Sequence, residues 1–276
     1  MPLCYRIIKA NMIGIYLVAT NSYFILGLRF IKRFIHHYKG DSAIKFYFFS
    51  DVDPTPYLKD QINVRFFKTS HNNWVDGTNS KFKNILDNQK ELLNGCEYLY
   101  YFDADTNITN DFNENWFIGD LVGGEHYGNK TFLSNGAGFE RNPISKAYVP
   151  EDSQLPYTYY YGAFFGGKTK MVINFAKILR QNQLIDQEIP YEPAVNDESY
   201  INQYFHYHPP TKTVPTENFQ FNISDKGGIG ETRNIELDIS WYKESLLKNP
   251  DLVFDLTSGD LIFFNRDNSL YLHSIK

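Results

Sequence analysis

The sequence predicts an α/β fold with a sheet that is at least partly parallel. Strand-like and helix-like runs alternate along the first half, and residues 13–19, 22–38 and 44–50 form one strand–helix–strand unit. A helix that joins two neighbouring strands makes those strands parallel. Aromatic residues make up 17% of the chain, with 21 Tyr and 23 Phe, and this content favours a sheet-rich core.

The first half has the order strand, helix, strand, strand, helix, strand. The expected strands are residues 13–19, 44–50, 64–67 and 98–102, and the expected helices are residues 22–38 and 78–93. The residues expected on the buried faces of these helices are Phe24, Leu28, Ile31, Ile35, Phe82, Ile85, Leu86 and Leu93. This order is typical of a Rossmann-like, nucleotide-binding half.

The second half has weaker signals. The expected strands are residues 121–126, 157–165 and 261–264, and the expected helices are residues 168–184 and 197–207. Pro209 and Pro210 would stop the last helix. No linker or repeat divides the chain, so we expect one domain over residues 1–276.

Composition and charge exclude several classes of protein. The formal net charge of −5 provides no basic surface for nucleic acid. The two cysteines, Cys4 and Cys96, are too few for a disulfide framework and suit a reducing compartment. The longest early apolar run, residues 12–19, is shorter than the roughly 20 residues that cross a bilayer, and no cleavable signal is visible. We therefore expect a protein without a membrane span.

The strand at 98–102 leads directly into two carboxylates, Asp103 and Asp105. Side chains two residues apart in a strand can point to the same face, and open α/β sheets bind ligands beyond the carboxyl ends of their strands. Adjacent carboxylates repel unless a cation lies between them, and hard divalent ions prefer such oxygens. These features favour a divalent metal site at Asp103 and Asp105. The alternative interpretation is an ordinary polar turn after a strand.

Two other motifs have simpler explanations. The acidic spacing from Asp103 to Glu114 resembles an EF-hand loop, but Ile108 occupies the position that needs glycine and a strand-like run precedes the loop. Residues 162–169, GAFFGGKT, match the P-loop pattern, although two adjacent phenylalanines suit a strand better than a phosphate-binding loop.

Asp197 and Glu198 begin the helix expected at residues 197–207. Acidic residues in a first turn interact favourably with the helix dipole, and Asp197 can cap the helix. On spacing alone, a structural role for both carboxylates is therefore the simplest interpretation.

Taken together, four segments resemble glycosyltransferase family 6, which includes the histo-blood-group A and B transferases, α-1,3-galactosyltransferase and Forssman synthase, with soluble bacterial and phage relatives. The segments are FDAD at 102–105, FERNPISKAYVP at 139–150, YYYGAFFGG at 159–167 and DESYINQY at 197–204. Each is weak alone, but the four occur in family order with similar spacing. The resemblance extends from about residue 13 to residue 215.

The resemblance implies a GT-A fold, in which a mixed sheet is flanked by helices. It implies a nucleotide-binding half at about residues 12–107 and an acceptor-binding half and C-terminal tail at about residues 108–276. It implies retaining transfer of galactose or N-acetylgalactosamine from the UDP form to a galactoside hydroxyl, with an α-1,3 linkage. The implied partners are a UDP-sugar donor and an oligosaccharide or glycan acceptor, and the implied cofactor is Mn²⁺ or Mg²⁺.

The resemblance also assigns residues to this site. The implied donor-binding residues are Val18, Thr20, Tyr23, Lys81, Asp103, Asp105, Ala163 and Asp197. The implied acceptor-binding residues are His126, Ala163 and Glu198. Among these, Asp103 and Asp105 would bind the metal, Ala163 would measure the 2-substituent of the donor sugar, and Glu198 would be the catalytic carboxylate nearest the anomeric carbon.

The chain departs from the family pattern mainly on the acceptor side. Val195 and Asn196 stand where Trp-His is common, and residues 127–129 replace a Pro-Gly-Phe segment. Lys226 and Arg233 are candidates for a cationic tail, and the acceptor stays open. Two aspartates without a Golgi anchor suggest a cytoplasmic enzyme of bacterial or phage origin. A P-loop nucleotide enzyme and a non-catalytic carbohydrate-binding protein are the alternatives.

Overall fold

The computed structural model describes residues 12–215, apart from 22, 73, 107, 109–110, 117, 131–135 and 190, together with two strands at 261–264 and 270–273. The strands of the first half are β1 (Met12–Val18), β2 (Ala43–Ser50), β3 (Val64–Lys68) and β4 (Tyr98–Phe102). Its helices are α1 (Tyr23–His37), α2 (Trp74–Asp87) and α3 (Gln89–Gly95). The predicted order of elements is confirmed, except that two helices, α2 and α3, stand where one was expected.

The second half adds strands to the same sheet and two long helices. Its strands are β5 (Leu121–Glu125), β6 (Tyr160–Lys168) and the short β7 (Lys212–Val214), and its helices are α4 (Thr169–Asp186) and α5 (Asn196–Tyr207). Two further strands, β8 (Leu261–Phe264) and β9 (Leu270–His273), pair with each other in an antiparallel hairpin. β8 is the strand expected at 261–264, whereas Lys226 and Arg233 lie outside the described residues.

The main sheet has seven strands in the order β3-β2-β1-β4-β6-β5-β7. β6 is antiparallel to both of its neighbours, and the other pairs in this sheet are parallel. The sheet is therefore mixed, as predicted. Because β6 alone is reversed, its first residues lie at the same edge as the last residues of β1, β4 and β5.

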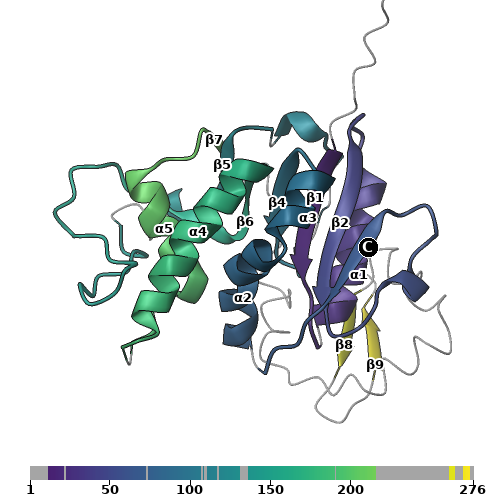
Figure 1. Cartoon of the computed structure of the whole chain (residues 1–276), viewed down its shortest axis with the longest axis horizontal. Coiled ribbons are helices and arrows are strands. Elements are labelled where there is room, and N and C mark those ends of the chain that lie inside the picture. Colours follow the sequence, from purple (N-terminus) through teal and green to yellow (C-terminus); the bar gives the residue numbers. More distant parts are fainter. Residues whose placement is uncertain are drawn as a thin grey trace, which may run out of the picture.

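Helices cover both faces of the sheet (Figure 1). One core cluster joins α1 to alternate residues of β1, β2 and β4, and the other joins α2, α3, α4 and α5 to the intervening residues. In β4, for example, Tyr100 packs on the α1 side and Tyr101 on the α2 side. The strands are apolar on both faces because both faces are covered.

The structure corrects the helix expected at 78–93. The segment forms two helices, α2 and α3, and the first begins at Trp74. At the break, Asn88 leaves the helical region with φ −110° and ψ 12°, and its side-chain amide donates to the carbonyl oxygen of Asn84. A side chain that hydrogen-bonds the helix backbone in this way competes with helix continuation. The break leaves Leu93 exposed, contrary to expectation.

Two other predictions differ in detail. Ile35 is exposed, because the buried stripe of α1 runs through Phe24, Leu28, Ile31 and Phe34 instead. The strand expected at 157–165 is β6, which begins at Tyr160 and continues to Lys168. Most of the segment that matches the P-loop pattern lies in this strand, as its two adjacent phenylalanines indicated, and it pairs with β4 from Phe164 to Lys168. Its backbone amides are therefore engaged in the sheet and in side-chain contacts, and they do not wrap a phosphate. The EF-hand is also excluded, since strand β4 precedes Asp103.

Candidate active site

The predicted site residues gather at the edge of the sheet where β1 and β4 end, β6 begins and helix α5 starts. Tyr16 of β1 pairs with Tyr101 of β4, so Val18 and Asp103 each lie two residues further along adjacent strands. The amide N–H of Asp103 donates to the carbonyl oxygen of Ala163 in β6, over 3.0 Å. This edge is where open α/β sheets bind ligands.

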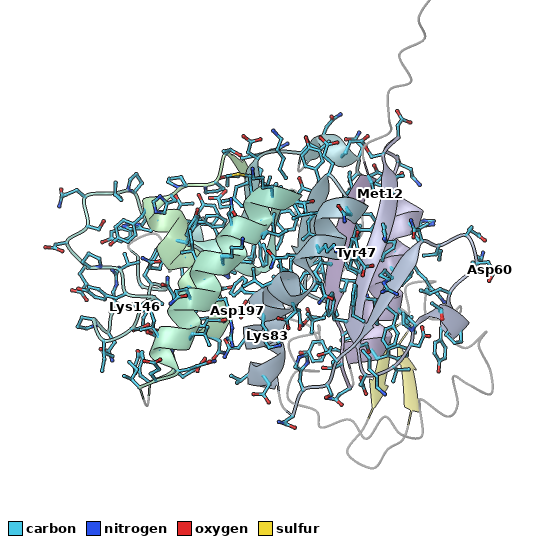
Figure 2. All side chains as sticks on the ribbon, in the orientation of Figure 1. Met12, Tyr47, Asp60, Lys83, Lys146 and Asp197 are labelled. Carbon is cyan, nitrogen blue, oxygen red and sulfur yellow. The ribbon has the colours of Figure 1, made fainter. Side chains whose placement is uncertain are left out.

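Lys81 is the centre of the cluster. It lies on α2, and its side chain is 3% exposed. Its Nζ is 3.2 Å from Asp103 Oδ1 and 2.8 Å from Asp197 Oδ2, and it donates to the carbonyl oxygen of Gly162 over 3.3 Å. Lys81 therefore connects α2, β4, β6 and α5. Figure 2 labels Asp197 beside α2, where the second half of the chain meets that helix.

Burial and charge oppose each other in this ion cluster. Burial alone would lower the pKa of Lys81, but the Asp103 and Asp197 carboxylates outweigh it and raise the pKa above its usual value. Burial raises the pKa of Asp197 to about 6, and Lys81 limits this rise. Lys81 stays charged at neutral pH and keeps Asp197 largely ionised.

Glu198 is held separately from Asp197. The N–H of Gly162 donates to Glu198 Oε2 over 2.5 Å, and the hydroxyl of Tyr159 also hydrogen-bonds the carboxylate. Burial raises the pKa of Glu198 to about 7, against the effect of these two donors. Gly162 needs to be small here, since an added Cβ would lie 2.9 Å from the Cβ of Glu198.

The start of α5 directs these two carboxylates away from their own helix. Val195 is the N-cap residue and makes no side-chain capping bond, while Asn196 adopts a positive φ of 41°. Asp197 and Glu198 instead contact Lys81 on α2 and Gly162 on β6. Capping of α5 therefore does not account for either side chain.

Asp103 and Asp105 interact with charged or polar groups on different elements. The hydroxyl of Tyr101 donates to Asp103 Oδ1 over 2.5 Å, on the side of α2. Burial and the charge of Arg33 lower the pKa of Arg29 on α1 to about 10, and the charge of Asp105 opposes that shift. The strand ends at Phe102 and the chain turns at Ala104, so the alternation of a strand does not extend to Asp105.

These two aspartates have the chemistry that a hard divalent cation requires. The Asp103 side chain is 25% exposed, which leaves part of its carboxylate open. Within the described residues, no three His, Cys, Asp or Glu side chains form a set that could hold a metal ion. A cation at this position would therefore need further oxygens from a bound ligand or water, as magnesium sites beside phosphates do.

His126 lies at the end of β5, beside the first residues of β6. Its ring centroid is 4.3 Å from that of Tyr161 and 5.6 Å from that of Tyr159, the tyrosine that contacts Glu198. The N–H of Gly128 donates to His126 Nδ1 over 2.9 Å, which requires an unprotonated Nδ1. Burial lowers the pKa of His126 to about 4, so the ring is neutral at physiological pH.

Val18, Thr20 and Tyr23 lie at the end of β1 and the start of α1. Thr20 Oγ1 is 3.1 Å from His71 Nδ1, and the side-chain amide of Asn21 donates to the carbonyl oxygen of His71. These contacts join the end of β1 to the loop before α2.

Several residues at the site had not been expected there. Tyr101, Tyr159, Gly162 and His71 all contact a predicted site residue. Tyr101 could have been found, since it precedes Asp103 by two residues in a strand and so shares its face. The contacts of Tyr159 and Gly162 depend on how α5 packs on β6, which local sequence does not reveal.

Comparison with known sequences identifies the family. The sequence model for glycosyltransferase family 6 matches residues 4–229, most of the chain. The chain belongs to glycosyltransferase family 6. Its mixed sheet with helices on both faces is consistent with the GT-A fold expected of this family.

Named relatives of the family 6 chain come from vertebrates and a bacterium. It is 27% identical to histo-blood group ABO system transferase 1 of Rattus norvegicus over 215 residues, covering 76% of this chain and 61% of the relative. It is 27% identical over 214 residues to globoside alpha-1,3-N-acetylgalactosaminyltransferase 1 of Gallus gallus, covering 74% of this chain and 60% of the relative. It is also 27% identical over 204 residues to the O-antigen biosynthesis glycosyltransferase WbnI of Escherichia coli, covering 72% of this chain and 84% of the relative.

The chain thus matches 61% of the length of the rat transferase. Within the part of the chain that the structure describes, no helix combines the length and apolar character needed to cross a membrane.

Proposed function

We propose that this family 6 chain transfers galactose or N-acetylgalactosamine from its UDP form to a hydroxyl group of a galactoside, with retention and an α-1,3 linkage. The observation that carries the proposal is the convergence of Asp103, Asp197 and Glu198 around Lys81 and Gly162 at the ligand-binding edge of the sheet. Three buried or half-buried carboxylates at such an edge suit a reaction in which a sugar cation develops.

In this proposal the donor lies across the ends of β1, β4 and β6. Val18, Thr20 and Tyr23 flank the uridine, and Lys81 and Asp197 contact the donor sugar. Asp103 and Asp105 would hold Mn²⁺ or Mg²⁺. The ion would neutralise the negative charge that develops on the departing UDP.

Glu198 acts on the positive charge that develops at the anomeric carbon. A carboxylate on the face opposite the leaving group stabilises that charge or attacks the carbon directly. The N–H of Gly162 donates to Glu198 Oε2 and holds the carboxylate in place. This fixed position limits reorganisation during the reaction.

His126, Ala163 and Glu198 would bind the acceptor on the side of β5 and β6. Ala163 also occupies the position that measures the 2-substituent of the donor sugar. Its methyl group is the smallest side chain after that of glycine. One methyl group in a pocket is worth about 1–3 kcal/mol of discrimination. We therefore propose a preference for UDP-galactose over UDP-N-acetylgalactosamine.

The test is UDP release from both donors over a panel of galactosyl and fucosyl-galactosyl acceptors, with the anomeric configuration of the product determined by NMR. We expect acceptor-dependent release, an α-linked product, a higher kcat/KM for UDP-galactose, loss of turnover in EDTA and recovery with Mn²⁺. Sugar binding without transfer on any acceptor would identify a carbohydrate-binding protein instead. Full turnover in EDTA would remove the metal from the proposal.

A further inference from the structure

The buried phenol of Tyr101 contacts the carboxylate of Asp103, which we assign to the metal. Tyr101 is 2% exposed, and its ring packs between Tyr16, with 5.3 Å between ring centroids, and Phe165, with 5.1 Å. Its hydroxyl group donates to Asp103 Oδ1 over 2.5 Å. Packing on both sides fixes the ring, so the direction of this hydrogen bond is also fixed.

Lys81 reaches the same oxygen atom. Its Nζ is 3.2 Å from Asp103 Oδ1 and 4.6 Å from the centroid of the Tyr101 ring. The backbone of Lys81 is held as well, since the hydroxyl of Tyr16 donates to its carbonyl oxygen over 3.1 Å. Both side-chain contacts found for the Asp103 carboxylate in the described chain thus involve Oδ1.

We infer that Tyr101 is a positioning residue for metal and donor binding. Together with Lys81, it holds Asp103 by Oδ1 and presents Oδ2 to the cation and diphosphate of the UDP-sugar. The inference rests on the proposed function, because it concerns the same site. In this inference Tyr101, a residue of strand β4, sets the orientation of the Asp103 carboxylate without itself contacting the substrate.

A tyrosine suits this task because its hydroxyl donates to Asp103 Oδ1 from a ring that Tyr16 and Phe165 hold in one position. Partners that orient a metal-ligating carboxylate typically change metal affinity 10- to 100-fold when they are removed.

The test compares Tyr101→Phe with Tyr47→Phe. The first substitution removes the hydroxyl and keeps the ring, so the packing on Phe165 and the contact with Lys81 persist. Tyr47 is an equally buried tyrosine of the same core cluster, on β2, and it has no place in the proposed site (Figure 2). Mn²⁺ affinity is measured from the EPR signal of free Mn²⁺ at saturating UDP, and UDP affinity is measured separately in EDTA.

We expect Tyr101→Phe to weaken Mn²⁺ binding by about 10- to 100-fold. UDP affinity in EDTA should stay unchanged, and Tyr47→Phe should match the wild type in both measurements. Unchanged Mn²⁺ affinity in Tyr101→Phe would overturn the inference and leave the proposed function intact, as would an equal loss in both variants. If wild-type protein binds no Mn²⁺ with UDP and transfers sugar in EDTA, the inference fails together with the metal of the proposed function.

Discussion

At the scale of single residues, the charge of Lys81 is what makes the site possible. Asp103 and Asp197 approach each other through this one ammonium group, which is almost fully buried. Removing one partner from a buried ion pair leaves an uncompensated charge, and this typically costs about 3–5 kcal/mol. Lys81 therefore contributes to stability as well as to the proposed donor binding.

We predict that Lys81→Met destabilises the protein by about 3–5 kcal/mol at pH 8 and by less at pH 5. The folded-state pKa of Asp197, about 6, lies above its usual value of 3.8, so the native state gains a proton as the pH falls through this range. Below pH 6 the protonated Asp197 no longer needs a cation. The pKa of Lys81 itself is raised, so its charge is the same at both pH values.

Urea unfolding at the two pH values measures this difference, and Lys83→Met is the matched control. Lys83 lies on the same helix and pairs with Asp87, but both side chains are exposed. An exposed pair is worth about 0–1 kcal/mol, so this variant should remain close to the wild type. Equal losses in the two variants would contradict the role assigned to Lys81.

Glu198 gives the second prediction at this scale. Glu198→Gln keeps the shape of the side chain and removes the charge that would stabilise the sugar cation. We expect kcat to fall by about 100- to 1,000-fold, the effect of losing one preorganised electrostatic contact, while the Kd for UDP-galactose changes little. In the wild type, kcat should rise with pH through about 7, because burial raises the pKa of Glu198 to that value.

Steady-state kinetics and calorimetry of donor binding test this prediction. Glu140→Gln is a suitable control, since Glu140 is a buried carboxylate that accepts backbone N–H groups of Asn142 and Ala194 outside the site. Wild-type turnover in a folded Glu198→Gln variant would remove this residue from the mechanism.

At the scale of elements, the reversed strand β6 joins the two halves of the site. Its first residues contact α5: the side chain of Asn202 accepts from the N–H of Tyr160 and donates to the carbonyl oxygen of the same residue. Gly162 then provides an N–H to Glu198 and a carbonyl oxygen to Lys81. A parallel strand at this place would bring its other end to the site.

We predict that Gly162→Ala displaces Glu198. The added Cβ would lie 2.9 Å from the Cβ of Glu198 and 3.0 Å from its Oε2, closer than van der Waals contact allows. Such overpacking typically costs about 1–3 kcal/mol of stability. A misplaced catalytic group can lose about 100-fold in rate, so we expect kcat to fall by that order.

Thermal unfolding and kcat measure the two effects, with Gly77→Ala on α2 as the control. A Cβ at Gly77 would have its nearest neighbour at 3.8 Å, and alanine in a helix is favoured over glycine by about 1 kcal/mol. This variant should therefore be as stable as the wild type or more so. A Gly162→Ala enzyme with normal kcat would show that Glu198 does not depend on this contact.

At the scale of the whole molecule, the site is shared between the two halves of the chain. Lys81 and Asp103 come from the first half, and Asp197 and Glu198 come from the second. A ligand that contacts both halves should stabilise the whole fold. A ligand present at 100 times its Kd adds about 2.7 kcal/mol to the free energy of unfolding.

We therefore predict that UDP with Mn²⁺ raises the melting temperature by several degrees, whereas ATP with Mg²⁺ does not. A P-loop would favour ATP, but the candidate segment pairs with β4 from Phe164 to Lys168 as a sheet strand and does not form a phosphate-binding loop. Differential scanning fluorimetry with UDP, ATP and CMP distinguishes a UDP-binding site from an ATP-binding P-loop. A shift with ATP that equals the shift with UDP would contradict the specificity proposed for Val18, Thr20 and Tyr23.

The sequence by itself determined the class of fold and the order of its elements, because hydrophobic periodicity records which face of each strand and helix is buried. Thus the aspartates after β4 and the acidic start of α5 could be found from local pattern and family resemblance. The sequence did not indicate that Asn88 divides a helix or that a turn at Ala104 ends the strand alternation before Asp105. These features depend on a side-chain hydrogen bond and on a turn.

Only the tertiary structure decided how the site is assembled. The reversal of β6 brings Gly162 to Glu198, although the two residues are 36 positions apart, and the packing of α2 places Lys81 between two aspartates. On spacing alone, Asp197 and Glu198 were best explained as residues of a helix start. Their contacts lie outside that helix because long-range packing, which local sequence does not encode, supplies a cation for one carboxylate and a backbone N–H for the other.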